Sequence, residues 1–344
     1  MKIALVYHSL VRGGGKERYV ADLARGLAEA GDEVEIYAQR VDPTVAAECR
    51  AKTRLVRPLP VPRLLAPLAF AAAIERLRLV DRADRVVSLT NVGGQHLHIG
   101  GTHIGYLEAL GLRARLKDRV MLANERRTFL RAPRIVTHSR MVAGEIERHY
   151  GVPRDRLATI YPPVDTARFR PLTGPERSAA RVRYGFEADL RYFLFPSTGH
   201  YRKGLDIAAA AFASLGDTPA RLAVAGRPPE GPAATHIRYL GYVTEMARLY
   251  GAADCTILPT RYEPFGLVIA ESLQCGTPVI VPSSAGVAEI LDGEEARLLP
   301  DLTVETVRAA VLAALDRPAR LDGGFGERKG LTVADHVAAI KRLL

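Results

Sequence analysis

Residues 259–271, PTRYEPFGLVIAE, are the most informative part of the sequence. It follows the short apolar run Cys255–Leu258, which reads as a buried strand, and it opens a helix. If that helix begins near Gly266, the backbone N–H groups of Gly266, Leu267 and Val268 lack partners within the helix and can bind an anion. We therefore expect an α/β unit here, with a ligand site where the strand gives way to the helix.

Short apolar runs alternate with helical stretches on either side of this segment, which is the pattern of parallel sheets with crossover helices. The predicted strands are Ile3–Tyr7, Val34–Ala38, Leu55–Arg57, Arg85–Leu89 and Ile135–His138 in the first half, and Tyr192–Pro196, Arg221–Ala225, Ile237–Leu240, Cys255–Leu258 and Val279–Val281 in the second. Predicted helices include Glu17–Glu29 and Met141–His149, the latter capped by Ser139. The fold class is α/β, with doubly wound parallel sheets.

The chain is long enough for two such domains, because it has 344 residues, of which 48% are hydrophobic. The consecutive prolines in the segment 161–165 can continue neither a helix nor a central strand, so they predict a linker. We expect an N-terminal domain over 1–161, a C-terminal domain over 162–330, and a terminal helix over 331–344 that packs back toward the N-terminal domain.

Cysteine content and hydropathy favour a cytoplasmic protein. Cys49, Cys255 and Cys275 are widely separated and have no CxxC spacing, so neither a disulfide framework nor a structural zinc site is implied. No segment approaches the roughly 20 uninterrupted apolar residues that a membrane-spanning helix needs.

The net charge of +10 comes entirely from the first half of the chain. Residues 1–160 hold 27 Lys or Arg and 17 Asp or Glu, whereas residues 161–344 hold 21 of each. Eight of the basic residues fall in 111–134 and alternate with leucines at helical spacing. The segment 110–134 is therefore predicted to contact an anionic membrane surface, with a solvated helical face as the alternative.

Two glutamates in the opening stretch could hold a sugar nucleotide. Glu263 lies in the predicted loop and can face a sugar ring, while Glu271 lies about one turn into the helix. A carboxylate there can accept hydrogen bonds from both hydroxyls of a ribose. Either glutamate alone is common in α/β proteins, so their combination carries the prediction.

A second stretch, residues 195–206, FPSTGHYRKGLD, leaves a strand and enters a helix with Arg202 and Lys203 at its start. Cations at a helix N-terminus oppose the helix dipole, and an anionic ligand would reverse that cost. Arg can bind two oxygens of a diphosphate, and Lys supplies a point charge. The alternative is a pair of solvated basic residues.

The remaining motifs exclude several chemistries. The glycine-rich turn 12–18, RGGGKER, allows close approach of a phosphate or sugar but matches neither a dinucleotide fingerprint nor a Walker loop. The histidines are scattered without metal-ligand spacing, and no acidic pair follows a strand. We therefore expect no metal and no cofactor. No GxSxG elbow is present, which disfavours a hydrolase.

Taken together, these stretches resemble family 4 of the retaining glycosyltransferases, which have the GT-B fold of two Rossmann-like domains facing each other across a cleft. The resemblance covers nearly the whole chain. It is carried by Gly13-Gly14-Gly15, Ile160–Asp165 with Phe169, Arg202-Lys203-Gly204, Glu263-Pro264-Phe265-Gly266 through Glu271, Cys275–Val279, and Ser284–Ile290.

The resemblance implies a role for each matching residue. Glu263 would bind donor-sugar hydroxyls, Glu271 the ribose, and Arg202 with Lys203 the diphosphate. His103 would lie near the sugar C6 hydroxyl, although a structural histidine is the alternative. The expected catalytic residues are thus Arg202, Lys203, Glu263 and His103; the expected donor-binding residues are Gly14, Gly15, Ser197, Thr198, Pro264, Phe265, Gly266, Leu267, Val268 and Glu271.

One departure from the family pattern narrows the resemblance. The family usually has Gly-Arg at the start of the phosphate loop, and this chain has Gly199-His200 with a shortened turn. The short loop and the basic segment are similar to those of the lipopolysaccharide core glucosyltransferases. This favours glucose transfer from UDP-glucose to a cell-envelope glycan or glycolipid acceptor, by an enzyme peripheral to the inner membrane face. A mannosyl- or N-acetylhexosaminyl-transferase is the alternative.

Proteins of other classes fit less well. A non-catalytic nucleotide or nucleic-acid binder would use the basic first half, but aromatic residues are only 6% of the chain and do not alternate with the charges. We therefore expect no nucleic-acid partner. A dehydrogenase would need the missing dinucleotide fingerprint. A sugar phosphorylase of similar fold would bind pyridoxal phosphate through a lysine.

Overall fold

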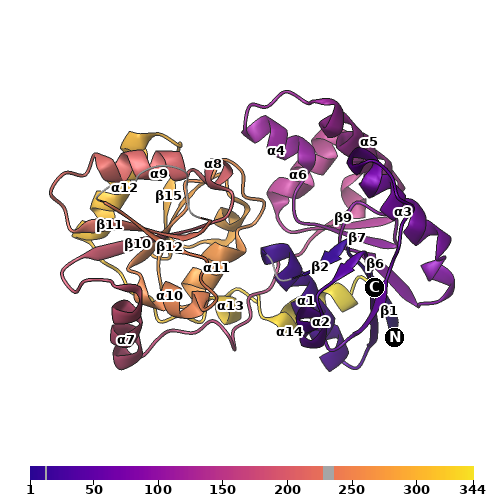
Figure 1. Cartoon of the computed structure of the whole chain (residues 1–344), viewed down its shortest axis with the longest axis horizontal. Coiled ribbons are helices and arrows are strands. Elements are labelled where there is room, and N and C mark those ends of the chain that lie inside the picture. The colour runs from indigo at the N-terminus through magenta and orange to yellow at the C-terminus, as the bar shows by residue number, and fades with distance from the viewer. Residues whose placement is uncertain (12–13, 228–235) are drawn as a thin grey trace. The chain divides into compact units, whose positions relative to one another are not determined.

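The computed structural model describes residues 1–11, 14–227 and 236–344. The chain forms two compact units, each α/β (Figure 1). Unit 1 comprises Met1–Pro163 together with Thr332–Leu344, and unit 2 comprises Val164–Leu331. The chain therefore passes from unit 1 to unit 2 and back again, and its last segment belongs to unit 1.

Unit 1 is built on a seven-stranded parallel sheet with the strand order β5-β3-β1-β6-β7-β8-β9. The strands are β1 (Lys2–Val6), β3 (Glu33–Ala38), β5 (Lys52–Leu55), β6 (Arg85–Ser88), β7 (His96–Ile99), β8 (Arg134–Thr137) and β9 (Leu157–Thr159). The short strands β2 (Ser9–Leu10) and β4 (Arg40–Val41) pair separately.

Helices cover both faces of this sheet because successive strand side chains point to opposite faces. Ile3 and Leu5 pack with helix α1 (Gly15–Glu29) and with α14 (Val333–Lys341), whereas Ala4 and Val6 pack with α3 (Ala66–Arg76). Helices α5 (Leu116–Arg131) and α6 (Arg140–Tyr150) pack against β7 and β8. The unit is completed by α2 (Pro43–Glu48), α4 (His103–Ala109) and the 3-10 turns η1 (Arg63–Leu65), η2 (Leu79–Asp81) and η3 (Arg154–Arg156).

Unit 2 has a six-stranded parallel sheet with the order β12-β11-β10-β13-β14-β15. Helices α9 and α12 pack together on one face, and α7, α10 and α11 lie on the other (Figure 1). The strands are β10 (Arg191–Ser197), β11 (Ala220–Gly226), β12 (Ile237–Gly241), β13 (Cys255–Ile257), β14 (Val279–Pro282) and β15 (Ala296–Leu299). The helices are α7 (Gly174–Tyr184), α8 (His200–Lys203), α9 (Leu205–Ala213), α10 (Met246–Ala252), α11 (Leu267–Gln274), α12 (Val304–Asp316) and α13 (Phe325–Arg328), with the 3-10 turn η4 (Gly286–Ile290).

Both sheets are doubly wound, as the sequence predicts. In each, the first long strand lies in the interior and the strand order reverses beside it, between β1 and β6 in unit 1 and between β10 and β13 in unit 2. Ligands of doubly wound folds bind at the carboxyl ends of the strands at such a reversal. The topology of unit 2 therefore predicts a ligand site at the loops after β10 and β13.

The predicted strands are found, one of them shifted, and the predictions omit the short strands β2 and β4 and three strands of the two main sheets. The segment predicted at Leu55–Arg57 overlaps β5 only at Leu55, because β5 is an edge strand whose Lys52 and Arg54 are largely exposed and hide the apolar pattern. Strands β7, β9 and β15 were not predicted; β7 contains two buried histidines, which interrupt its apolar run. Ser139 caps α6 as predicted, accepting a hydrogen bond from the backbone N–H of Val142.

Candidate active site

Two loops at the carboxyl ends of β10 and β13 bring most of the predicted residues of unit 2 together. Ser197 ends β10, and Thr198 leads into the one-turn helix α8, which contains Arg202 and Lys203. The loop after β13 contains Glu263, and it leads into α11. Because β10 and β13 are neighbours at the reversal of strand order, both loops emerge side by side.

Main-chain contacts lock the two loops against each other. The carbonyl oxygen of Arg202 accepts hydrogen bonds from the backbone N–H of Arg261 at 2.8 Å and from the Thr260 hydroxyl at 3.1 Å. Gly204 has φ +79°, and a Cβ atom there would lie 1.9 Å from the carbonyl oxygen of Pro259. Only glycine fits this close approach.

Arg261 adds a side-chain clamp between the same loops. Its guanidinium donates to both carboxylate oxygens of Asp206, at 2.9 and 2.6 Å, and to the carbonyl oxygen of Tyr201. It also lies 4.2 Å above the Tyr201 ring. These hydrogen bonds hold the pKa of Asp206 below its usual range. Sequence reasoning gave Arg261 no role, since no local spacing links it to Asp206.

Arg202 and Glu263 form an ion pair, with Nη1 of Arg202 3.2 Å from Oε2 of Glu263. The same Nη1 atom also donates to the carbonyl oxygen of Tyr262. The loop that carries Glu263 is fixed from the other side, where the backbone N–H groups of Gly286 and Val287 donate to the carbonyl oxygens of Glu263 and Phe265. The predicted sugar-binding and phosphate-binding residues are therefore in direct contact.

Lys203 is half-buried next to the ion pair of Arg202 and Glu263. Its ammonium donates to the carbonyl oxygen of Pro196 at 3.0 Å. Burial lowers the pKa of Lys203, and the neighbouring charge of Arg202 lowers it further, whereas the carboxylates of Glu263 and Glu271 oppose the shift. A further anion beside Lys203 would favour its charged form.

The helix that follows begins as the sequence predicts. Gly266 is the N-cap of α11 with φ +105°, and Leu267 and Val268 are its first two residues, so their N–H groups are not used by the helix. Pro264 and Phe265 form the turn before it, and Phe265 is buried. Glu271 is also buried, and its Oε2 accepts a hydrogen bond from the Tyr250 hydroxyl at 3.1 Å.

One predicted detail is wrong. Arg202 and Lys203 do not begin a helix; they are the last two residues of α8, and Gly204 separates them from α9. Cations at the end of a helix are favourable, so the dipole argument for an anion does not hold in that form. The support for an anion site comes instead from Arg202, which contacts the loop that precedes α11, and from Lys203, which is held next to it against Pro196 of β10.

The glycines predicted in unit 1 lie at the start of α1. Gly14 is the N-cap of this helix and Gly15 its first residue, and Gly13 lies outside the described residues. Helix α1 follows β1 and β2, so its N-terminus lies on the carboxyl side of the sheet of unit 1. Acidic Glu17 lies in the first turn, where it also accepts a hydrogen bond from the Tyr7 hydroxyl at 3.3 Å.

His103 also belongs to unit 1 and is the first residue of α4. Its Nε2 lies 3.0 Å from a carboxylate oxygen of Asp118, and its backbone N–H donates to Glu125 at 2.8 Å. A hydrogen bond from the backbone N–H of Arg115, and then the contact with His103, hold the pKa of Asp118 below its usual range. Burial raises the pKa of Glu125, which also accepts a hydrogen bond from Tyr150. The orientation of the ring is thus fixed by Asp118, a partner that sequence reasoning missed.

Metal clusters and membrane spans are both absent from the described part of the chain. Among its residues, no three or more His, Cys, Asp or Glu side chains gather in a way that could hold a metal ion. No described helix is both long and apolar enough to cross a membrane. All three cysteines are buried and unpaired, and burial raises the pKa of each thiol.

Comparisons with known proteins agree with this arrangement. Residues 13–168 match the model of Glycosyltransferase Family 4, and residues 191–317 match that of Glycosyl transferases group 1. A probable transglycosylase of Burkholderia thailandensis is 37% identical, over 99% of this chain and 96% of the relative. A D-inositol 3-phosphate glycosyltransferase of Catenulispora acidiphila is 28% identical, over 91% of this chain and 84% of the relative.

Solved structures share the fold at lower identity. WaaG, a glycosyltransferase involved in lipopolysaccharide biosynthesis, has a TM-score of 0.80 and 19% identity, covering 98% of this chain and 95% of that one. HepE of Anabaena, in complex with UDP and glucose, has a TM-score of 0.79 and 15% identity, covering 100% and 99%. With two family models matching successive parts of the chain and one relative 37% identical over almost its whole length, the chain belongs to glycosyltransferase family 4 and is a glycosyltransferase of the GT-B fold.

Proposed function

We propose that the chain transfers a hexose from a UDP-sugar to a cell-envelope glycan or glycolipid, with retention of configuration at the anomeric carbon. Glucose from UDP-glucose is the leading donor, and lipopolysaccharide core the leading acceptor. The observation that carries the proposal is the convergence of Arg202, Lys203 and Glu263 at the strand-order reversal of unit 2, beside the start of α11. A relative of the same fold binds UDP and glucose, and another acts in lipopolysaccharide biosynthesis.

In this proposal unit 2 binds the donor. Arg202 and Lys203 neutralise the diphosphate, and the N–H groups of Leu267 and Val268 donate to it. Glu271 accepts hydrogen bonds from the ribose, with one carboxylate oxygen already oriented by Tyr250. Glu263 holds hydroxyls of the sugar; its ion pair with Arg202 links sugar binding to phosphate binding. Ser197 and Thr198 line the strand end from which the phosphate loop emerges.

Transfer proceeds by front-face displacement. The bond from the anomeric carbon to the phosphate oxygen breaks, and a bond to the acceptor hydroxyl oxygen forms on the same face. The acceptor proton passes to an oxygen of the departing diphosphate. Arg202, Lys203 and the α11 amides stabilise the negative charge that develops on that leaving group. The protein thus needs no metal or cofactor, because its own cations and amides balance the charge.

In the proposal, residues of unit 1 add further contacts to the donor. Gly14 and Gly15 place backbone without side chains at the start of α1, where a phosphate can approach closely. His103 contacts the C6 hydroxyl of the donor sugar, and Asp118 keeps its ring in one orientation. If the Nε2–H group donates a hydrogen bond to Asp118, the other ring nitrogen is left to act as a hydrogen-bond acceptor.

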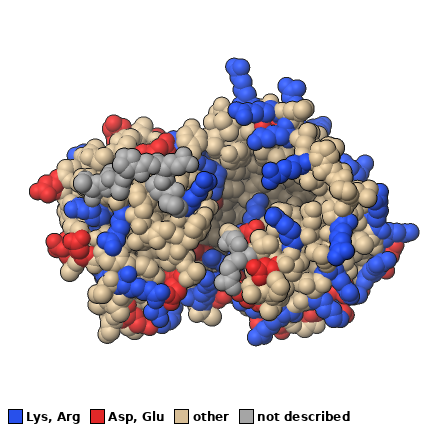
Figure 2. All heavy atoms as spheres, viewed as in Figure 1, with Lys and Arg blue, Asp and Glu red and all other residues tan. Residues whose placement is uncertain are grey.

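Membrane contact through residues 110–134 is part of the proposal. Helix formation within this segment is limited to Leu116–Arg131, and its buried residues include Phe129. Leu112, Leu116 and Met121 are exposed among the basic residues. Lys and Arg side chains gather over unit 1 on the face drawn in Figure 2. An exposed apolar and basic surface of this kind binds anionic bilayers peripherally.

A second acceptor class is favoured by the relatives named D-inositol 3-phosphate glycosyltransferases. Those names describe transfer to a small phosphorylated polyol rather than to a glycolipid. A mannosyl or N-acetylhexosaminyl donor is the corresponding alternative on the donor side.

The test is a thermal-shift panel of UDP- and GDP-sugars, followed by mass spectrometry of products with heptose-bearing, polyprenyl-linked and inositol phosphate acceptors. The proposal expects the largest stabilisation with UDP-glucose and a hexosylated lipopolysaccharide-core product. A product with inositol phosphate alone would replace the proposed acceptor. No stabilisation by any nucleotide sugar, with purified protein that unfolds cooperatively, would reject the donor site.

A further inference from the structure

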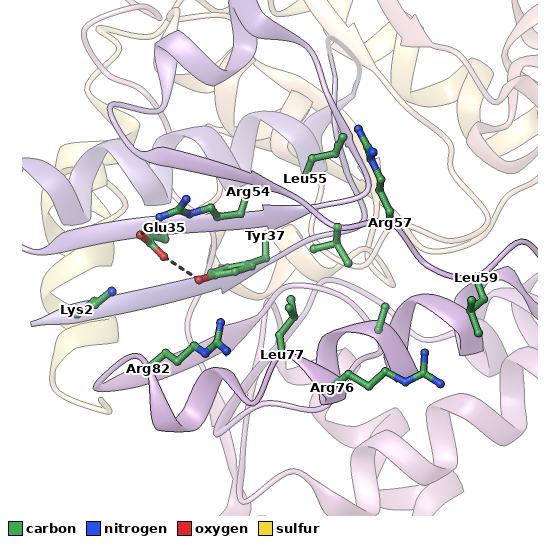
Figure 3. Close-up of a pocket in the computed structure, with 12 residues that line it drawn as sticks. Lys2, Glu35, Tyr37, Arg54, Leu55, Arg57, Leu59, Arg76, Leu77 and Arg82 are labelled. Carbon is green, nitrogen blue, oxygen red and sulfur yellow. Dashed lines mark hydrogen bonds and ion pairs between the residues drawn. The ribbon is translucent and has the colours of Figure 1, made fainter.

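A cavity of about 670 Å³ lies in unit 1, and none of the predicted donor residues lines it. It occupies the face of the sheet that α3 covers, beside β3 and the edge strand β5 (Figure 3). Lys2, at the start of β1, lies at one end, whereas Leu59 and Arg76 lie at the other (Figure 3). The lining residues are Lys2, Glu35, Tyr37, Arg54, Leu55, Val56, Arg57, Leu59, Ala73, Arg76, Leu77 and Arg82.

The cavity wall carries a large excess of positive charge. Five of the lining residues are basic and one, Glu35, is acidic. Glu35 is already satisfied, because it accepts a hydrogen bond from Tyr37 at 2.7 Å and forms an ion pair with Arg54 at 3.1 Å. These contacts hold its pKa below the usual range.

The other four cations have no such partner. Within the described part of the chain, no ion pair within 4 Å involves the side chains of Lys2, Arg57, Arg76 or Arg82. Clustered cations repel one another unless an anion lies among them. The unbalanced charge therefore favours a ligand with at least one anionic group.

Exposed leucines border the same cations. Leu55 is 54% exposed and Leu59 is 62% exposed, although both line the cavity. A smaller hollow shares Val56, Arg57 and Leu59 with the cavity, so the apolar surface continues beyond Arg57. Contiguous exposed apolar surface next to charge marks a binding site more often than scattered single residues do.

The apolar segment 57–63 is not an unpaired strand that could add to the edge of the sheet. Residues 57–63, RPLPVPR, have proline at every second position, and proline cannot donate to a strand ladder. The prolines instead hold the chain extended with Leu59 and Val61 exposed between two arginines. The surface is thus suited to a ligand that is both apolar and anionic.

We propose that this cavity binds the phosphate and part of the hydrocarbon chain of an anionic membrane lipid. The phosphate lies at the Leu59 end of the cavity, beside Arg57 and Arg76, and the chain lies along Leu55 and Leu59. Arg82, at the Lys2 end, adds to the positive charge of the cavity. The lipid is an anchor and takes no part in the sugar transfer, because no residue that lines the cavity is among the predicted catalytic or donor-binding residues. The cavity is also distinct from residues 110–134.

The experiment measures sedimentation of the full chain with vesicles of phosphatidylcholine containing 30 mol% phosphatidylglycerol. The variant carries Arg57→Gln, Arg76→Gln and Arg82→Gln. Each basic residue near an anionic surface strengthens binding by about fivefold, so the triple variant should bind at least tenfold more weakly. A charge-matched control carries Arg148→Gln, Arg154→Gln and Arg317→Gln, exposed positions outside the cavity, and should bind within about twofold of wild type. Equal loss in both triple variants would show a general effect of net charge and reject the site.

Two further arms separate a lipid from a free anion and from the neighbouring surface. Leu55→Asn with Leu59→Asn should also weaken vesicle binding; if it has no effect while inorganic phosphate stabilises wild type and not the arginine triple variant, the cavity binds a free phosphate and the lipid proposal fails. Arg113→Gln with Arg119→Gln tests residues 110–134; if only that pair lowers binding, the cavity is not the lipid site. Thermal stabilisation by UDP should be the same in each variant as in wild type. This result shows that the variant is folded, and it distinguishes loss of lipid binding from loss of the donor site.

Discussion

At the scale of single residues, the predicted donor site depends on two cations with different surroundings. Arg202 is ion-paired with Glu263, whereas Lys203 is half-buried against the carbonyl oxygen of Pro196. Both charges are held by the protein before any ligand binds, so they need little rearrangement when charge develops on a leaving diphosphate. Each should therefore contribute more to the transition state than to substrate binding.

Replacing either cation tests this directly. Arg202→Ala and Lys203→Ala should each lower kcat/KM by the equivalent of about 2–4 kcal/mol, as loss of other anion-stabilising donors does. Arg317→Ala, at an exposed position of unit 2, serves as the control and should be close to wild type. Steady-state kinetics with saturating acceptor gives the comparison. Wild-type turnover in the Arg202 or Lys203 variant would remove the phosphate role.

Gly204 makes a second prediction at this scale. Gly204→Ala places a Cβ atom against the Pro259 carbonyl oxygen and forces a positive φ on alanine, so it should separate the two loops of the site. Gly216 has φ +63°, and a Cβ atom there would meet nothing within 4 Å, so Gly216→Ala reports the backbone strain alone, about 1 kcal/mol. The difference between the two in unfolding free energy and in UDP affinity measures the loop contact. If the two variants have equal unfolding free energies and equal UDP affinities, the contact between Gly204 and Pro259 adjusts to the added methyl group without loss of stability.

At the scale of secondary-structure elements, α14 shows how a distant segment completes a domain. It belongs to unit 1 although 168 residues of unit 2 precede it in the chain, and it packs along α1. A Cβ atom on Gly26 of α1 would lie 2.7 Å from Val337 and 2.8 Å from Val333. The absence of a side chain at Gly26 thus allows the two helices to approach closely.

Two glycine substitutions distinguish this packing from helix propensity. Gly26→Ala should destabilise unit 1, because the added methyl group overlaps α14. Gly144→Ala in α6 has nothing within 4 Å and should stabilise the protein by about 0.5–1 kcal/mol, the usual preference of a helix interior for alanine. Urea denaturation checks both signs, and stabilisation by both variants would show that α14 adjusts freely.

The docking of α14 should also depend on pH. His336 is buried in α14, where it contacts the Tyr19 hydroxyl at 3.2 Å and the carbonyl oxygen of Tyr161 at 2.9 Å. Burial lowers its pKa to about 4, from 6.5 in an unfolded chain. The unfolded state therefore takes up a proton first, and stability falls as pH decreases from 6.5 to 4, by up to about 3 kcal/mol. His336→Gln should show a shallower loss over this range in urea denaturation; an unchanged slope would assign the acid sensitivity to other groups.

The elements also show what the sequence could predict. Buried strands such as β1 and β10 have apolar runs in the sequence, and these runs are enough to predict them as strands. The prediction for β5, at the sheet edge, is shifted, and β7, with its two histidines, is not predicted. The positions of both strands depend on neighbouring strands that lie far along the chain. In the site, Glu263 and Arg202 were predicted from local motifs. The clamp between Arg261 and Asp206 and the contact between His103 and Asp118 were not, since only the folded chain brings those pairs together.

At the scale of the whole molecule, charge and chemistry are divided between the two units. The positive excess lies in the first half of the chain, and the two cations predicted to bind a diphosphate, Arg202 and Lys203, lie in unit 2, whose half of the chain is close to neutral. Net charge therefore does not select the donor. It is more relevant to the proposed membrane contact, because anionic lipids attract basic proteins over a distance of about 10 Å at moderate salt.

This division predicts that a metal chelator and added salt affect the intact enzyme differently. EDTA should leave sugar transfer unchanged, because Arg202, Lys203 and the first amides of α11 replace a divalent ion at the diphosphate. Raising NaCl from about 50 to about 500 mM should weaken vesicle binding at least tenfold, since exposed charges are screened, while transfer to a soluble acceptor falls much less. Initial rates with soluble and vesicle-borne acceptors, each with EDTA and with salt, separate the effects. If EDTA abolishes transfer and Mg²⁺ restores it, a bound ion rather than the two cations neutralises the leaving group.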